Sequence, residues 1–447
     1  MAEFTPMMKQ YLQIKEEYKD CILFYRLGDF YEMFFEDAKL ASSVLDLVLT
    51  GKACGQEERA PMCGVPFHSA DNYIARLVSH GYKVAICEQM EDPALAKGLV
   101  SREVVRIITP GTVIESNMLE EGKNNYLACL CYGEGKTGIS FIDISTGTVS
   151  VTEVEETLNG ERSLDELGRF SPRELLVNAQ AAKLKSLGLY REKLEGTGLE
   201  QRAEAEFDLE RARETVEEHF GRTTEEMDLT GENAIRSLGA ALTYLYEVQK
   251  NDLANLLEIH CYTDSKYMKL DFSARRNLEL TETLRNREKR GTLLWILDKT
   301  KTAMGKRLLR SYLEQPLVSI GGIVRRQNAV AFLVDQMQIR DQIADCMIPI
   351  HDMERLITRI SYGTANAREL RSLYETLSRL APIKALLQGA GTELLQQIEQ
   401  DIDPLTDVMD LIDSAITDDP PFSVREGGMI KNGYHQELDE LREIVQN

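Results

Sequence analysis

The sequence predicts a multi-domain protein in which two α/β domains are followed by an all-α region. Its length of 447 residues exceeds the roughly 250 to 300 residues that one hydrophobic core usually serves. Strand-like and helix-like apolar patterns alternate up to about residue 251, and helical periodicity dominates from about residue 265. We place the domains at residues 1–115, 122–252, 260–420 and 421–447.

The first domain begins with a helix, because Thr5 is a good N-cap and Pro6 suits the first helical turn. The apolar runs 21–27 and 30–34 predict two strands, and Gly28-Asp29 between them predicts a tight turn. The remaining elements are expected as helices at 38–48 and 72–79 and strands at 83–87 and 104–109, closed by Pro110-Gly111.

The second domain is expected to hold a three-stranded meander. Residues 126–132, 138–144 and 148–154 predict strands, and Gly133 to Lys136 predicts a hairpin turn between the first two. Ser171-Pro172 is expected to cap a short helix before residues 175–177. A later helix is indicated by an apolar stripe at Ile235, Leu238, Leu242 and Leu245.

The third region reads as an assembly of helices. Apolar residues recur at helical spacing in 293–297 and 308–313, and prolines at 316, 349, 382 and 404 are expected to separate helices of ordinary length. A last helix is expected at 434–445, and the sequence then stops at Asn447 without a capping signal. We therefore expect the sequence to be a truncated piece of a longer protein.

Charge is distributed unevenly along the chain. The formal net charge of −21 argues against indiscriminate binding to nucleic acid. Residues 151–220 carry 17 acidic against 10 basic side chains, whereas residues 266–326 carry 15 basic against 6 acidic ones. The basic segment is a surface that faces phosphate, a solvated helix face, or a helix face that pairs with the acidic segment 151–220.

Several classes of site are excluded by their missing motifs. The sequence has no apolar run of about 20 residues and no basic, apolar leader at its start, so we expect a cytoplasmic protein. Its 8 cysteines form no CxxC pair and are expected to be reduced and mostly buried, and its 6 histidines form no HxxxH or HExxH pair. The triplet Gly135-Lys136-Thr137 lacks the earlier glycine of a phosphate-binding loop, and no GxSxG elbow occurs. No catalytic residue or metal ligand is predicted, and an enzyme with an unrecognised α/β active site is a weak alternative.

The segment Gly28 to Phe34 is the strongest candidate for a functional site. In an extended strand Phe30 and Glu32 point to the same face, so an aromatic ring lies beside a carboxylate just after a tight turn. Such a pair suits the probing of an unpaired or mispaired base. The alternative interpretation is that Phe30 belongs to the core and Glu32 is a solvated strand residue.

Ordered blocks of the sequence support the first interpretation. They are FYRLGDFYEMF (24–34), PMCGVPFH (61–68), AICEQ (85–89), RIITPGT (106–112), RRNLEL (275–280), TAMGKR (302–307) and GGMIKNGY (427–434). In this order they resemble the bacterial MutS family of DNA mismatch-repair sensors. The resemblance covers essentially the whole chain.

The resemblance implies a role for each domain. It identifies residues 1–115 as a mismatch-recognition domain, 122–252 as an RNase-H-like connector, 260–420 as a helical core and lever, and 421–447 as the start of a clamp. It also implies DNA-binding roles for Gly28, Phe30, Tyr31 and Glu32, and places Met62 near the minor groove. Phe30 is then the stacking wedge and Glu32 the hydrogen-bonding acid.

These roles are chemically reasonable. A wedge that enters a base step must offset an unstacking cost of a few kcal/mol, which is lower where a mispair already loosens the step. An aromatic face stacks on any base and recovers about 1–3 kcal/mol. An ionised Glu32 is repelled by an intact duplex unless a displaced base offers a donor or the acid takes up a proton.

The resemblance implies partners that the residues do not show by themselves. Members of the family are homodimeric ATPases that need ATP and Mg²⁺, yet this sequence lacks GxxxxGK followed by Ser or Thr, so no cofactor is expected for residues 1–447. Duplex DNA with mismatches or small insertion/deletion loops, a MutL-type partner and the sliding clamp are implied, as is association with the nucleoid. The alternative function is that of a MutS relative that binds branched or recombination DNA.

Overall fold

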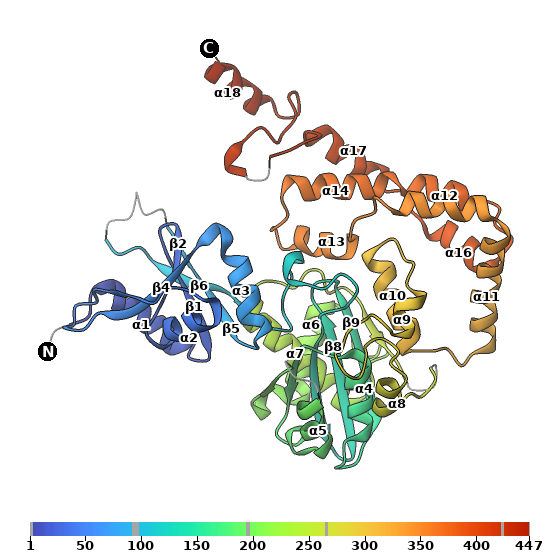
Figure 1. Cartoon of the computed structure of the whole chain (residues 1–447), viewed down its shortest axis with the longest axis horizontal. Coiled ribbons are helices and arrows are strands. Elements are labelled where there is room, and N and C mark those ends of the chain that lie inside the picture. The colour runs from blue at the N-terminus through green and yellow to red at the C-terminus, as the bar shows by residue number, and fades with distance from the viewer. Residues whose placement is uncertain (1–2, 92–97, 194–196, 264–266, 422–423, 447) are drawn as a thin grey trace. The chain divides into compact units, whose positions relative to one another are not determined.

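The computed structural model describes residues 3–91, 98–193, 197–263, 267–421 and 424–446. The chain forms two compact units (Figure 1). The first unit comprises Met1–Glu120 and Asn124–Thr263, and the second comprises Glu121–Lys123 and Asp264–Asn447. No helix among the described residues is long and apolar enough to cross a membrane.

The first unit begins with a six-stranded sheet, drawn in blue in Figure 1, with the strand order β3-β4-β2-β1-β5-β6. Strands β1 and β5 are parallel, and the other neighbours are antiparallel. The strands are β1 (Cys21–Leu27), β2 (Phe30–Phe34), β3 (Thr50–Lys52), β4 (Ala60–Pro66), β5 (Lys83–Gln89) and β6 (Arg102–Ile108).

Both faces of this sheet carry packed helices. On one face, Tyr31 and Met33 of β2 join a core that includes residues of α2 (Phe35–Leu45) and α3 (Ala70–Ser79). On the other face, Tyr11 of α1 (Pro6–Glu17) packs edge-on against Tyr25 and Phe34, with ring centroids 5.4 and 4.9 Å apart. The predicted cap of α1 is confirmed, since Thr5 Oγ1 accepts a hydrogen bond from the Met8 amide.

The second sheet of the first unit has the order β11-β10-β7-β8-β9-β12. The predicted meander is confirmed as β7, β8 and β9, which are antiparallel, while β10, β11 and β12 extend the sheet by parallel pairing. The turn residues Glu134 and Gly135 both have positive φ, as a tight two-residue hairpin requires. The strands are β7 (Leu127–Gly133), β8 (Lys136–Asp143), β9 (Thr148–Glu155), β10 (Glu174–Val177), β11 (Gly198–Gln201) and β12 (Ile259–Cys261).

Helices cover both faces of the second sheet. One face packs against α4 (Glu161–Phe170) and α5 (Lys185–Lys193) around Phe141. The other face meets α7 (Glu232–Gln249), which packs beside α6 (Leu209–Phe220). At Gly138 the α7 backbone comes so close that a Cβ atom would lie 1.9 Å from the Asn233 carbonyl carbon. The glycine therefore permits this close packing.

The second unit is helical, as predicted. Its helices are α8 (Phe272–Asn277), α9 (Leu293–Leu297), α10 (Ala303–Glu314), α11 (Ile320–Asp335), α12 (Met337–Met347), α13 (Met353–Ser361), α14 (Ala367–Ser378), α15 (Leu380–Leu387), α16 (Glu393–Asp401), α17 (Thr406–Ala415) and α18 (Gln436–Gln446). One core lies between α14 and α17, and another lies among α11, α15 and α16. Among the residues that the structure describes, 3-10 segments lie at Phe67–Ser69, Ser116–Met118, Ala181–Lys183 and Glu204–Phe207 in the first unit and at Val424–Glu426 in the second.

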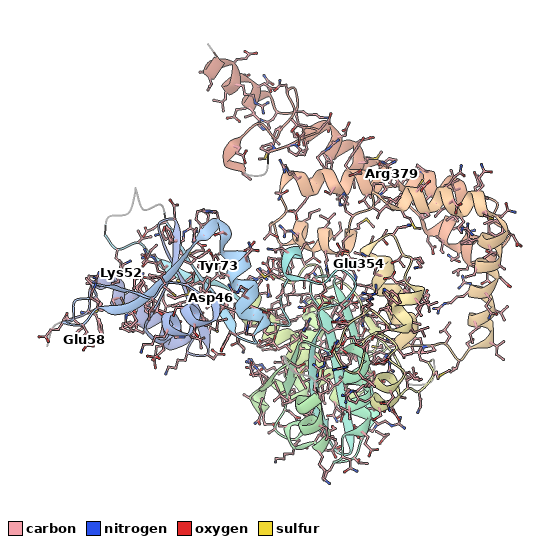
Figure 2. The ribbon with its side chains drawn as sticks, in the orientation of Figure 1. Asp46, Lys52, Glu58, Tyr73, Glu354 and Arg379 are labelled. Carbon is pink, nitrogen blue, oxygen red and sulfur yellow. The ribbon has the colours of Figure 1, made fainter. Side chains whose placement is uncertain are left out.

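A buried arginine holds α10 against the start of α13. Arg307 is 5% exposed and forms two hydrogen bonds of 2.7 Å to Asp352 and one of 2.6 Å to Glu354, which is labelled in Figure 2. A bidentate arginine pair of this kind fixes orientation as well as distance. Arg307 also donates to the Glu121 carbonyl, which ties residues 121–123 to the helical unit.

Some sequence predictions were wrong in detail. The helix expected at 38–48 is α2, which ends earlier because Asp46 takes a left-handed conformation (φ 56°). Ser171-Pro172 does not cap a following helix, since Ser171 (φ 48°) ends α4. Pro382 lies inside the first turn of α15, where a proline is tolerated, and so does not separate two helices. Strands β3 and β4 were not predicted, although β4 pairs with the whole of β2.

The cysteines lie where a reduced, structural role would place them. Six of the eight are buried, as expected. Burial raises the pKa of the Cys21, Cys87 and Cys131 thiols to about 12. These thiols therefore stay protonated and unreactive near neutral pH.

Candidate nucleic-acid interface

Phe30 lies at the tip of the β1–β2 hairpin and is exposed. Leu27 pairs with Phe30 across the turn formed by Gly28 and Asp29. Gly28 has a φ of +59°, which favours glycine, and no atom lies within 4 Å of the position a Cβ would take. The Phe30 side chain is 46% exposed, so the interpretation of Phe30 as a core residue is excluded.

Alternation along β2 divides its side chains between two faces. Tyr31 and Met33 face the core beneath α2, as their burial shows. Phe30 and Glu32 therefore share the opposite face, as the spacing predicts. Farther along this face, Phe34 is buried against Tyr11, so α1 covers one end of β2 and leaves the Phe30 end open.

Arg26 braces the turn that presents Phe30. Its guanidinium carbon lies 3.7 Å from the ring centroid of Phe67, and its Nε donates a 2.5 Å hydrogen bond to the Gly28 carbonyl. The Phe67 amide donates to the Asp29 carbonyl at 2.9 Å. A cation–π contact contributes about 0.5–1 kcal/mol at such a site. Both residues of the turn are thus tied to the start of the Phe67–Ser69 segment.

Tyr31 supports the hairpin from the core side. Its hydroxyl donates to the Glu88 carboxylate on β5, and the same carboxylate lies 3.5 Å from an Arg26 nitrogen. Burial, together with the nearby Glu88 charge, raises the pKa of Tyr31 above its usual range. The phenol therefore remains a hydrogen-bond donor at neutral pH, and its side chain points away from the face that carries Phe30.

Glu32 forms an ion pair that the sequence did not reveal. Its carboxylate lies 2.5 Å from the ammonium of Lys52 on β3, which is labelled in Figure 2. The two side chains are 18% and 32% exposed, respectively. Gly64 pairs with Glu32 across the β2–β4 ladder. Glu32 is therefore a partly buried, charge-compensated acid rather than a freely solvated one.

Met62 lies at the other end of the β2–β4 ladder from Phe30. It pairs with Phe34, whereas Phe30 pairs with Pro66 four residues farther along β4. At about 3.3 Å per residue, this places Met62 some 13 Å along the strand from the Phe30 level. Met62 is half-buried, and its carbonyl accepts a hydrogen bond from Thr50. Gly28 and Phe30 therefore lie at one end of the ladder and Met62 at the other, with Tyr31 next to Phe30 and Glu32 midway along β2.

Several cations of the basic segment 266–326 pair with acids of their own unit. The ion pairs are Lys289 with Asp298, Lys306 with Glu121, Arg307 with Asp352 and Glu354, Arg310 with Glu314, and Arg325 with Glu393. Arg326 lies over the Tyr312 ring at 3.6 Å. The cations of these ion pairs thus meet acids of the second unit and not those of the acidic segment 151–220.

Sequence reasoning missed the residues that support the site: Arg26, Lys52, Gly64, Phe67 and Glu88. Arg26, Gly64, Phe67 and Glu88 all lie inside the blocks that carry the family resemblance, which was a usable signal. Lys52 lies outside those blocks, and only the pairing of β3 with β4 brings it near Glu32. In the described part of the chain, no group of three or more His, Cys, Asp or Glu side chains could hold a metal ion.

Comparison with known proteins supports the assignment of the whole chain. Three family models match: MutS domain I at residues 5–117, MutS domain II at 125–257 and MutS domain III at 273–447. Proteins named DNA mismatch repair protein MutS are 49% identical in Lachnoclostridium phytofermentans and 47% identical in Acetivibrio thermocellus. Each alignment covers 99% of this chain but 47% and 51% of those relatives, so the chain spans about half their length. The chain belongs to the MutS family and carries its domains I, II and III.

Proposed function

We propose that this chain binds duplex DNA at mismatches and small insertion/deletion loops, with Phe30 as a stacking wedge in the minor groove. The observation that carries the proposal is the exposure of Phe30 at the tip of a braced hairpin. The exposed ring can contact a base directly, and the bracing of its turn by Arg26 lowers the entropy that is lost when the ring inserts.

Glu32 acts beside the wedge as a selective acid. Its carboxylate shares a strand face with Phe30 and can accept a hydrogen bond from a displaced base. The same charge is unfavourable near the phosphates of an intact duplex. Gly28 permits the turn, Tyr31 supports it from the core, and Met62 lies along the same face toward the minor groove.

The decisive experiment compares a G·T duplex with its matched homoduplex for the wild type and Phe30→Ala. Loss of stacking worth about 1–3 kcal/mol corresponds to a roughly 5- to 150-fold loss of G·T affinity, with a much smaller loss for the matched duplex. Phe30→Trp should retain most of the discrimination. Leu158→Ala, which alters another exposed apolar side chain of the first unit, serves as the control. An equal loss for both duplexes in Phe30→Ala would refute the wedge.

Glu32→Gln tests the second residue. It should tighten matched-duplex binding by about threefold, because one negative charge near the phosphates is removed, and so narrow the discrimination. An unchanged affinity for the matched duplex contradicts this role. A four-way junction is included as a competitor, since preference for the junction over the G·T duplex would favour the alternative function on branched DNA.

The family resemblance supports further proposals about full-length members of the family. We infer that such a protein forms homodimers, hydrolyses ATP with Mg²⁺, and contacts a MutL-type partner and the sliding clamp in a nucleoid-associated repair process. Pull-down of each partner by this chain and by a full-length relative tests which contacts residues 1–447 supply. Binding by the full-length relative alone assigns a contact to other parts of that protein.

A further inference from the structure

We propose that Lys52 is a specificity-determining residue, because its ammonium neutralises Glu32 in the free protein and so weakens the repulsion between Glu32 and an intact duplex. This inference rests on the proposed function and deepens it. The repulsion between Glu32 and matched DNA then depends on Lys52, which lies 20 positions away in the sequence.

The strand pairing explains why Lys52 reaches Glu32. In β4, Ala60 pairs with Lys52 and Gly64 pairs with Glu32. Alternate residues of a strand share a face, so the Lys52 and Glu32 side chains lie on the same side of the sheet, one on each flank of β4. A Cβ atom at Gly64 would lie 3.5 Å from Glu32 Cγ and 3.2 Å from the Tyr31 carbonyl. The tight contact is the one with the Tyr31 carbonyl oxygen, so glycine suits the close approach of β4 to β2 beside Glu32.

The environment of the pair makes it stronger than an ordinary surface ion pair. Both side chains are mostly shielded from water, and the Lys52 ammonium also lies 5.6 Å from the centroid of the Phe34 ring. In the part of the chain that the structure describes, Lys52 is the ion-pair partner of Glu32. Shielding from solvent reduces screening, so removal of either partner changes the charge that the other presents.

Two effects of Lys52 on DNA binding can be separated. A lysine that merely contacts phosphate contributes the same factor whatever residue occupies position 32. A lysine that neutralises Glu32 contributes more when the acid is present than when it is absent. The difference between the two contributions is the coupling measured by a double-mutant cycle.

The experiment measures matched-duplex affinity by fluorescence anisotropy at low salt for the wild-type 447-residue chain, Lys52→Met, Glu32→Gln and the double variant. We expect Lys52→Met to lower affinity by about fivefold more in the wild-type background than in the Glu32→Gln background. Lys52→Arg should behave like the wild type, because it retains the charge.

Lys39→Met is the matched control. Lys39 also pairs with a glutamate, Glu36 at 2.7 Å, but both side chains are exposed and lie on α2, which packs on the other face of the sheet. It removes the same charge from the same domain and should show no coupling to Glu32. Circular dichroism of each variant verifies that it is folded.

Equal losses of matched-duplex affinity in the two backgrounds would overturn the inference and show that Lys52 contacts phosphate independently of Glu32. No loss in either background would also overturn it, since Lys52 would then have no effect on DNA binding. The proposed function is judged separately, from the ratio of G·T to matched affinity in the wild type and Phe30→Ala. A second double-mutant cycle, on the same variants, measures the unfolding equilibrium constant in urea and requires no DNA. A Lys52–Glu32 coupling of less than about twofold in the unfolding equilibrium constant would also refute the inference, even for a chain that binds DNA weakly.

Discussion

Replacing Glu174 with alanine should destabilise the first unit strongly, because this carboxylate joins the end of the first sheet to the second. Glu174 begins β10 and is 2% exposed. One oxygen accepts hydrogen bonds from the Thr109 hydroxyl at 2.5 Å and the Gly111 amide at 3.0 Å, and the other accepts from the Tyr244 hydroxyl at 2.5 Å. Thr109 and Gly111 directly follow β6, and Tyr244 lies on α7.

The size of the effect follows from these three hydrogen bonds. Each buried donor left without a partner costs about 1–3 kcal/mol, and water admitted to the new cavity offsets part of that cost. We therefore expect Glu174→Ala to lower the free energy of unfolding by about 3–5 kcal/mol. For a unit of this size the melting temperature should fall by roughly 10 °C. Glu174→Gln should lose much less, since its amide can accept from Gly111 and donate to the Tyr244 oxygen.

The pH dependence gives an independent measurement. Burial raises the pKa of Glu174 above its ordinary value, against the lowering effects of its hydrogen bonds and of Lys83. The folded state therefore holds this proton at pH values where the unfolded chain has released it. The contribution of Glu174 to stability is complete below the unfolded pKa of about 4.3 and is lost as the pH rises through the raised folded pKa.

Differential scanning calorimetry of the wild type, Glu174→Ala, Glu174→Gln and the exposed helix control Glu214→Ala tests both statements. The stability difference between wild type and Glu174→Gln should shrink as the pH rises above about 4.3. A loss below about 1 kcal/mol for the alanine variant would show that the hydrogen bonds are replaced by water. A stability difference that does not change with pH would refute the linkage argument.

Three further predictions concern other braced positions. Arg307→Met should destabilise the helical unit by about 2–4 kcal/mol in urea unfolding, because it removes a buried cation that forms a bidentate pair with the half-buried Asp352 and a further pair with Glu354. Arg340→Met, in an exposed pair, should cost less than about 0.5 kcal/mol. Similar losses for the two variants would contradict the role of burial. Gly28→Ala should lower the free energy of unfolding by about 1 kcal/mol, from backbone strain alone, because the surroundings of Gly28 are open. Gly28→Asn should lower the free energy of unfolding by less, because asparagine tolerates a positive φ better than alanine. Arg26→Met should reduce the ratio of G·T to matched-duplex affinity, because it removes the contacts of Arg26 with Phe67 and the Gly28 carbonyl. The free energy of unfolding should change by less than about 1.5 kcal/mol. An unchanged affinity ratio would show that the turn is rigid without Arg26.

Local sequence signals predicted the parts of the fold that short-range physics controls. The Thr5 cap, the hairpin at Gly28, the meander at 126–154 and the helical character of the second unit depend on neighbours within a few residues, and all are present. The same signals failed at Ser171-Pro172, where the residues end a helix instead of starting one. A polar residue before a proline suits either helix end, and only the packing of α4 selects between them.

The spacing of Phe30 and Glu32 is enough to predict that they share one face of a strand, because alternation is a property of the extended backbone. The tertiary structure decided that Phe30 is exposed, that Lys52 neutralises Glu32, and that Arg26 lies over Phe67. Tertiary packing also brings Lys306 and Arg307 of the basic segment to acids of their own unit. These contacts depend on which strands and helices become neighbours when distant segments pack together, and no local periodicity encodes that choice.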